Sequence, residues 1–173
     1  MSPAAGGFRV EPIDYATGLA ELRQVRETVF VQEQSVPLEL EWDDADPLCH
    51  HVIARDGDGA AIGTARLTPE RSIGRMAVLA PWRGRGVGAA LLTAMIDQAQ
   101  RLEWPAVSLH AQAHAIAFYA RHGFLAVGPR FDEAGIRFDY PRHFPWEEDG
   151  DSWTLDGNSA VIIITLGEAG QVV

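Results

Sequence analysis

The sequence predicts an α/β domain with mixed strand pairing, and three observations point to this fold class. The chain has 173 residues, which is about the length of one domain. Its hydrophobic share of 47% and charged share of 22% are typical of a globular protein with a sizeable core. Segments with strand periodicity alternate along the chain with segments of helical periodicity, which favours an α/β arrangement.

The first elements are a strand, a helix and an acidic loop. Residues 8–13 alternate between apolar and polar side chains, as a half-buried strand does. Apolar residues recur at helical spacing over 17–31, which predicts a helix. Residues 35–49 contain two prolines and a dense group of acidic residues, so we expect a loop there.

The next elements are a hairpin and a fourth strand. Residues 51–55 and 61–67 flank the turn Asp56-Gly57-Asp58-Gly59, which is a β-hairpin signal. Residues 73–79 predict a further strand. Pro81 cannot continue it as a central strand, because proline lacks the N–H that a sheet requires.

A glycine-rich turn over 83–88 opens the strongest predicted helix, which reaches about residue 101. Its apolar positions form one buried stripe: Val87, Leu91, Leu92, Met95, Ile96 and Ala99. Glycines in such a turn let the backbone approach a ligand, and the first N–H groups of the helix point at the same place. The turn therefore predicts a site for phosphate or pyrophosphate.

The remaining elements follow the helix. We expect a strand over 107–111, a short helix over 113–122 ended by Gly123, and strands over 124–127 and 136–140. Residues 159–166 predict a last strand. We expect this strand either at an edge of the sheet or in a contact between subunits, and the second alternative implies a homodimer.

Composition excludes several classes of function. The chain contains no Lys, so a P-loop and every lysine nucleophile are excluded. One Cys excludes a disulfide framework and a cysteine-rich zinc site. The formal charge of −10 argues against nucleic acid or an anionic membrane as a partner. With no signal peptide and no run of about 18 apolar residues, the sequence predicts a cytoplasmic protein.

The charge is unevenly distributed. Residues 131–173 hold nine Asp or Glu and two Arg, a net charge of −7. Residues 71–96 hold four Arg and no carboxylate, which suggests an anion site, although these arginines could also pair with acids elsewhere in the fold.

A dinucleotide site is the first alternative for the glycine-rich turn. Gly84, Gly86 and Ala89 fit the spacing of the Rossmann fingerprint. However, three residues separate the turn from the preceding strand, and the strand over 107–111 ends without the acidic residue that would hold a ribose.

Two motifs in the right order carry a resemblance to a known family. The first runs from Ile73 to Gly88 and ends in Arg83-x-x-Gly86-x-Gly88; the second is Gln112-x-x-Ala115-x-x-Phe118-Tyr119-x-x-x-Gly123-Phe124. Together they resemble the GNAT superfamily of acyl-CoA-dependent N-acyltransferases. Arg26-x-x-Val29-Phe30 with Glu41-x-Asp43-x-x-Asp46 is similar to the ElaA-like branch.

The resemblance implies a mostly antiparallel central sheet flanked by helices, with a splayed strand pair at the acyl-CoA site. It places the acyltransferase domain at 8–140 and leaves 141–173 as an acidic C-terminal extension with an extra strand. Phe138 stands where the branch has His, so a role for that position is in doubt.

The resemblance also implies a donor site for acetyl-CoA as co-substrate, without a metal. Backbone groups of Met76, Ala77 and Val78 would pair with the pantetheine arm, and the Val78 N–H would polarise the thioester carbonyl. Gln112 would lie near the same arm. The pyrophosphate would be held by the turn residues Arg83, Gly84, Arg85, Gly86, Val87 and Gly88.

The catalytic and acceptor residues have alternatives that the sequence leaves open. Tyr119 matches the family tyrosine that protonates the leaving thiolate, and it could equally be a core aromatic. His110 is the candidate base, with a buried structural histidine as the alternative. For the carboxylates Glu33, Glu41 and Asp43 the choice is between binding a small-molecule or protein amine and forming a solvated acidic loop.

Three functions from different classes are compatible with the sequence. The leading one is transfer of acetyl to a primary amine by direct attack in a ternary complex. The alternatives are an enzyme similar to the acyl-homoserine-lactone synthases and a non-catalytic regulatory module that binds acyl-CoA.

Overall fold

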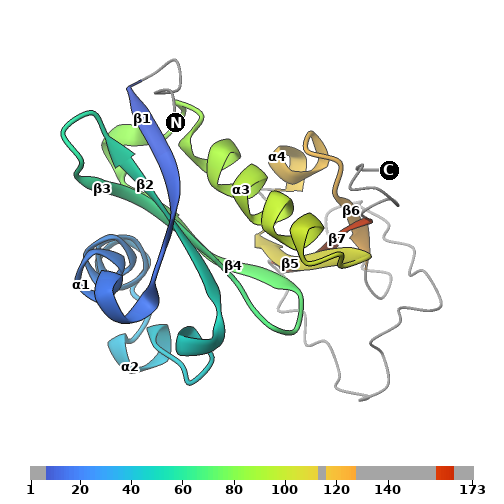
Figure 1. Ribbon diagram of the computed structural model, residues 1–173, viewed down its shortest axis with the longest axis horizontal. Coiled ribbons are helices and arrows are strands. Elements are labelled where there is room, and N and C mark those ends of the chain that lie inside the picture. The colour runs from blue at the N-terminus through green and yellow to red at the C-terminus, as the bar shows by residue number, and fades with distance from the viewer. Residues whose placement is uncertain (1–6, 113–115, 128–158, 166–173) are drawn as a thin grey trace. The chain divides into compact units, whose positions relative to one another are not determined.

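The structure is a computed structural model that describes residues 7–112, 116–127 and 159–165 (Figure 1). The chain divides into two compact units, Met1–Glu103 and Trp104–Val173. The strand predicted over 136–140, including Phe138, and the acidic stretch 141–158 lie outside the described residues.

A four-stranded antiparallel sheet forms the centre of the first unit. Its strands lie in chain order: β1 (Phe8–Ile13), β2 (His50–Asp56), β3 (Ala61–Leu67) and β4 (Ser72–Val78). All seven residues of β3 are buried, as expected for a strand with neighbours on both sides. β1 confirms the strand predicted over 8–13, β2 and β3 confirm the hairpin, and β4 confirms the strand predicted over 73–79.

The first helix changes its form partway along. Asp14 caps α1 (Tyr15–Arg26) by accepting from the Thr17 N–H, and the chain continues as a π-helix, η1 (Glu27–Glu33). The predicted single helix over 17–31 is therefore two helical forms end to end. The predicted loop over 35–49 contains two short helices, α2 (Leu38–Glu41) and the 3₁₀ turn η2 (Asp46–Leu48).

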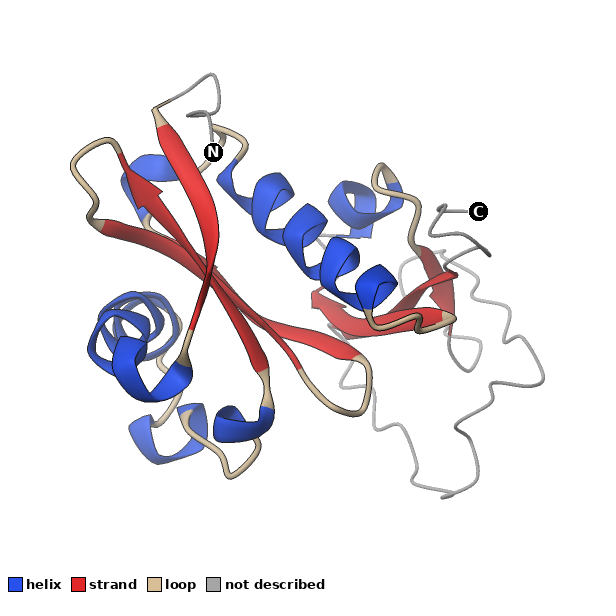
Figure 2. Cartoon of the chain, in the orientation of Figure 1, coloured by secondary structure: helices blue, strands red, loops and turns tan. Residues whose placement is uncertain are grey.

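The helices α1 and α3 (Val87–Arg101) cover opposite faces of this sheet (Figures 1 and 2). A short 3₁₀ turn, η3 (Ala80–Trp82), links β4 to α3. The predicted apolar stripe of α3 is confirmed, because all six of its residues are buried. Helix α3 approaches β3 closely at Gly63, where an added Cβ would lie 3.1 Å from the Leu91 side chain.

The described part of the second unit holds three antiparallel strands and a short helix. Its described elements are β5 (Ala106–Gln112), α4 (Ile116–Ala120), β6 (Leu125–Val127) and β7 (Ser159–Thr165). β7 lies between β5 and β6 and pairs with both. The expectation of an edge strand over 159–166 is therefore wrong, because both edges of β7 are occupied.

The predicted fold class is confirmed. Helices flank sheet strands, and every pairing described within either unit is antiparallel. Within the described ranges, no helix has the length and hydropathy that crossing a membrane requires.

Candidate functional site

The glycine-rich turn provides an open backbone surface at the start of α3. Gly84 and Gly86 have φ values of +73° and +86°, which glycine adopts far more readily than other residues. Apart from each glycine and its chain neighbours, no heavy atom of the described residues lies within 4 Å of where a Cβ would stand on either residue. No side chain caps the N-terminus of α3 at Gly86, so its first N–H groups are available to an anion.

Strand β4 reaches this turn through a bulge. Arg75 and Met76 together stand opposite Ala65, because Gly74 pairs with Arg66 and Ala77 pairs with Thr64. Arg75 has a φ of +49°, the left-handed conformation in which a bulge residue accommodates the extra length. The bulge sets the direction of the residues that follow, up to Val78.

The backbone N–H and C=O groups of Val78 point to the side of β4 away from β3. It stands opposite Gly63, and the next residue, Leu79, donates its N–H to the Ile62 carbonyl at 2.9 Å. In an antiparallel ladder this makes Val78 and Gly63 a non-hydrogen-bonded pair, so the N–H and C=O of Val78 point away from β3.

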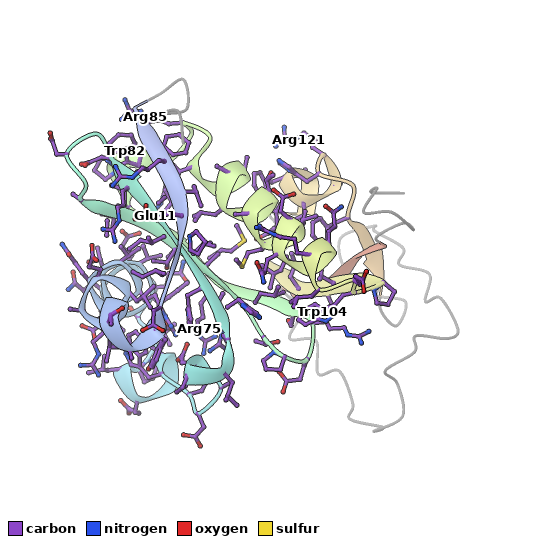
Figure 3. All side chains as sticks on the ribbon, in the orientation of Figure 1. Glu11, Arg75, Trp82, Arg85, Trp104 and Arg121 are labelled. Carbon is purple, nitrogen blue, oxygen red and sulfur yellow. The ribbon has the colours of Figure 1, made fainter. Side chains whose placement is uncertain are left out.

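The two arginines of the turn make different contacts. The Arg83 Nε donates to the Val78 carbonyl at 2.9 Å, and its Nη2 donates to Glu33 at 2.5 Å. The Arg85 guanidinium stacks over the Trp82 ring at 4.4 Å, and Figure 3 shows the two side chains together. The turn therefore holds one arginine that is engaged by protein groups and one that lies over an aromatic ring.

Two acidic residues of the 35–49 segment are buried in ion pairs with Arg26. The Arg26 Nε donates to Glu41 at 2.7 Å, and its Nη1 donates to Asp46 at 2.8 Å. All three residues are at most 2% exposed. The Trp42 ring lies against the same guanidinium at 4.0 Å. These residues are therefore not the solvated acidic loop that the sequence offered as one alternative.

Two more arginines extend this group, which we call the Arg26 cluster: Arg26, Glu41, Asp43, Asp46, Arg66 and Arg75. Arg66 donates to both oxygens of Asp43 at 2.8 Å and to Asp46 at 2.9 Å. Arg75 lies 3.5 Å from both Glu41 and Asp43. Three guanidinium groups thus face three carboxylates, and the cluster has no net formal charge.

The cluster shifts the pKa values of its acids in different directions. Burial raises the pKa of Glu41 despite the hydrogen bond from Arg26. The hydrogen bonds from Arg66 lower the pKa of Asp43 to about 2. Burial works against ionisation of Asp46, but the hydrogen bonds from Arg26 and Arg66 outweigh it and lower the pKa.

A cavity of about 570 Å³ lies elsewhere in the first unit, and no pattern in the sequence indicates it. It lies between β1, the start of β2 and the second half of α3. Its lining includes Tyr15, His50 and His51, and the rings of Tyr15 and His51 stack at 5.3 Å. Among the residues that the structure describes, no three His, Cys, Asp or Glu side chains are grouped to hold a metal ion.

Tyr119 lies in the short helix of the second unit. Its ring packs edge-on against Phe118 and Phe124 at centroid distances of 5.1 and 5.9 Å. Burial raises the pKa of its phenol, so the Tyr119 hydroxyl keeps its proton at neutral pH.

The predicted site residues fall into two groups. The first unit holds the proposed contacts of β4 and the glycine-rich turn, and it brings Glu33 to Arg83 and the pair Glu41 and Asp43 to Arg75. The second unit holds Tyr119, and also His110 and Gln112 at alternate positions of β5. Their β7 partners are Val161 and Ser159.

The structure limits one of these predictions. Glu41 is 2% exposed and bound to Arg26, so direct contact with an acceptor does not fit its burial. The sequence reasoning also missed Arg66 and Trp42, and no local pattern marks them, because their partners lie on other elements.

Comparisons with known proteins agree with the fold. Residues 19–139 match the model of the acetyltransferase (GNAT) domain family. The chain is 34% identical over 116 residues to the uncharacterised N-acetyltransferase YjcF of Bacillus subtilis, which covers 65% of this chain and 82% of that protein.

Two solved structures are similar over nearly the whole chain. An acyl-CoA N-acyltransferase from Pseudomonas aeruginosa has a TM-score of 0.66 and 28% identity, covering 90% of this chain and 98% of its own. ElaA of Escherichia coli has a TM-score of 0.68 and 23% identity, and the match covers 90% of this chain and 98% of ElaA. At this identity the similarity supports the fold alone.

Proposed function

The chain belongs to the GNAT acetyltransferase family, and on this premise we propose that it transfers an acetyl group from acetyl-CoA to a primary amine. The observation that carries the donor half of this proposal is the turn Gly84–Gly86. It follows β4 and η3 and leads into an uncapped helix N-terminus, with open space beside both glycines. An uncapped helix N-terminus suits a pyrophosphate group.

The chemistry places defined demands on the chain. An alkyl ammonium with a pKa of about 10.4 must lose its proton before it can attack the thioester carbonyl. A C–N bond then forms, the C–S bond breaks, and the leaving thiolate takes up a proton. We assign the oxyanion donor to the Val78 N–H, the proton donor to Tyr119, and the removal of the amine proton to His110 or to a water that it orients.

We assign the pantetheine arm to backbone groups of Met76, Ala77 and Val78 and to Gln112. The outward direction of the Val78 groups supports this assignment. No step in the scheme calls for a metal ion.

We place the acceptor amine near the acidic residues of the first unit. Asp43 and Glu33 keep partly exposed carboxylates, with 38% and 33% of their side chains accessible. The buried Glu41 would act indirectly, by holding Arg26 and thereby the segment that carries Asp43. We propose a small-molecule or protein amine as the acceptor, with the exposed edges of the Asp43 and Glu33 carboxylates as its contacts.

Further expectations follow from the charge and the family. A net charge of −10 disfavours nucleic acid and anionic membranes as partners, and we propose a cytoplasmic enzyme. The domain would span 8–140, with 141–173 as an acidic extension. A homodimer stays a prediction that the oligomeric state in solution would test.

The test is turnover with a panel of amines. The protein is incubated with acetyl-CoA and each amine, free thiol is followed, and the product mass is measured. Acetylated amine with stoichiometric thiol supports the proposal. Tight CoA binding without thiol release on any amine contradicts it and favours the regulatory module. Lactone formation from an acyl donor would favour the synthase-like alternative.

A further inference from the structure

Arg83 follows η3 and begins the glycine-rich turn, and its side chain reaches back to the end of β4. Its Nε donates to the Val78 carbonyl, and its Nη2 donates to the Glu33 carboxylate. Glu33 is the last residue of the π-helix η1. Fifty positions separate Glu33 from Arg83 in the sequence, so the fold itself brings these two residues together.

These contacts fix the peptide plane between Val78 and Leu79 at both ends. Its carbonyl accepts from Arg83, and its N–H donates to the Ile62 carbonyl on β3 at 2.9 Å. A peptide group is planar, so fixing its oxygen and its nitrogen sets the ψ angle of Val78. The direction of the Val78 N–H, on the preceding peptide, is then held by β4.

The carbonyl of Val78 lies on the same side of the strand as its N–H, away from β3. A bare carbonyl oxygen there would repel negative charge that develops on a thioester oxygen. A guanidinium bound to that carbonyl removes this repulsion and adds positive charge nearby. The carboxylate of Glu33 holds the guanidinium in that orientation.

We propose that Arg83 and Glu33 are a positioning pair that fixes the Val78 carbonyl and screens its negative charge beside the Val78 N–H and the acyl donor, rather than Arg83 binding the pyrophosphate. The inference rests on the proposed acyltransferase function. It assigns the side-chain contact with phosphate to Arg85 and to the N–H groups of the turn.

Donor truncation separates the two roles of an arginine. S-acetylpantetheine carries the thioester and the pantetheine arm but no pyrophosphate. The variants are Arg83→Gln, Glu33→Ala and Arg85→Gln, with Glu27→Ala as the matched control on the same π-helix. Glu27 pairs only loosely with Arg23, at 3.9 Å. Each variant is assayed with acetyl-CoA and with S-acetylpantetheine, on an amine that the wild type acetylates.

The positioning role predicts the same loss with both donors. We expect kcat to fall about tenfold to a hundredfold for Arg83→Gln and less for Glu33→Ala, with KM for acetyl-CoA changed less than kcat. Arg85→Gln should raise KM for acetyl-CoA alone, and Glu27→Ala should match the wild type. A loss in Arg83→Gln that appears only with acetyl-CoA would overturn the proposal and return Arg83 to the pyrophosphate.

Two further measurements test the pair without a truncated donor. The exchange Glu33→Arg with Arg83→Glu restores an ion pair but gives Val78 no donor, so recovery of turnover would contradict the positioning role. Calorimetric titration with CoA needs no turnover, and Arg83→Gln should keep its affinity within about threefold of the wild type. A wild type that binds CoA but acetylates no amine would instead count against the proposed function.

Discussion

Arg26 satisfies three acceptors at once while almost fully removed from water. It donates to the Glu41 carboxylate, the Glu41 carbonyl and the Asp46 carboxylate at 2.7 to 2.8 Å. The planar fork of a guanidinium suits such multiple contacts, and an ammonium could not replace it. Arg26 thereby fixes the segment that carries Asp43 to the end of α1.

Arg26→Ala should destabilise the protein strongly. It leaves the buried carboxylates of Glu41 and Asp46 without their main partner, which costs about 3–5 kcal/mol. Urea unfolding measures the loss. Arg23→Ala is the control, because Arg23 also faces the Trp42 ring, at 5.3 Å, but is 55% exposed and should cost less than about 1 kcal/mol. Equal midpoints for the two variants would show that the buried pairs add nothing.

Tyr119→Phe separates chemistry from packing at the proposed proton donor. The ring contacts with Phe118 and Phe124 survive the change, and only the hydroxyl is lost. We expect kcat to fall about 10²-fold to 10⁴-fold, while CoA affinity and the unfolding midpoint stay near those of the wild type. Full turnover in the variant would remove Tyr119 from the mechanism.

At the scale of elements, the position of the donor turn depends on how closely α3 lies on β3. A Cβ on Gly63 would stand 3.1 Å from the Ala77 carbonyl, 3.1 Å from Leu91 and 3.2 Å from Val87. Val87 is the first residue of α3. The distance between α3 and β3 at Gly63 therefore also sets the position of the α3 N-terminus, where the proposed pyrophosphate site lies.

Gly63→Ala should therefore affect both stability and binding. The added methyl pushes α3 away from the sheet, at a cost of about 1–3 kcal/mol, and CoA affinity should fall with it. Gly74→Ala on β4 is a matched control, since no described residue beyond its chain neighbours has an atom within 4 Å of its Cβ position and its φ is not positive. Both variants are compared by urea midpoint and CoA titration. Unchanged affinity in Gly63→Ala would separate the site from this contact.

The positions of the strands and of α3 could be predicted from the sequence, but the neighbours of each strand in the sheet could not. Every described strand and α3 lies close to its predicted position, because periodicity and turn residues act locally. The π-helix η1 was missed, since a helical apolar pattern does not distinguish i→i+4 from i→i+5 hydrogen bonds. The place of β7 between β5 and β6 was also missed, because its neighbours are set by topology.

The same limit applies to the charges of the candidate site. Counting residues gave an arginine-rich segment over 71–96 and an acidic segment over 35–49. In the fold, two arginines of the 71–96 segment, Arg75 and Arg83, lie against carboxylates of the predicted acceptor side. A net count cannot show this, since each pair joins residues 32 or 50 positions apart.

The whole molecule carries a charge of −10 at neutral pH, so acidification changes its stability in two opposing ways. Protonating surface carboxylates relieves repulsion across the molecule, which favours the folded state. Within the Arg26 cluster the sign is reversed for Asp43. Its folded pKa of about 2 lies below its unfolded value of about 3.8, so the folded state binds this proton less readily than the unfolded one.

The contribution of Asp43 is therefore complete above about pH 5 and is lost as the pH falls through about 2. Comparing wild type with Asp43→Asn isolates it, because relief of the overall repulsion is common to both proteins. The difference in the free energy of unfolding between wild type and variant should stay constant from pH 7 to about pH 5. It should then shrink by about 1 kcal/mol toward pH 2, a value that allows for the partial exposure of Asp43. A difference that stays flat over this range would mean that Arg66 does not hold Asp43 ionised, and that the partly exposed carboxylate is free of the cluster.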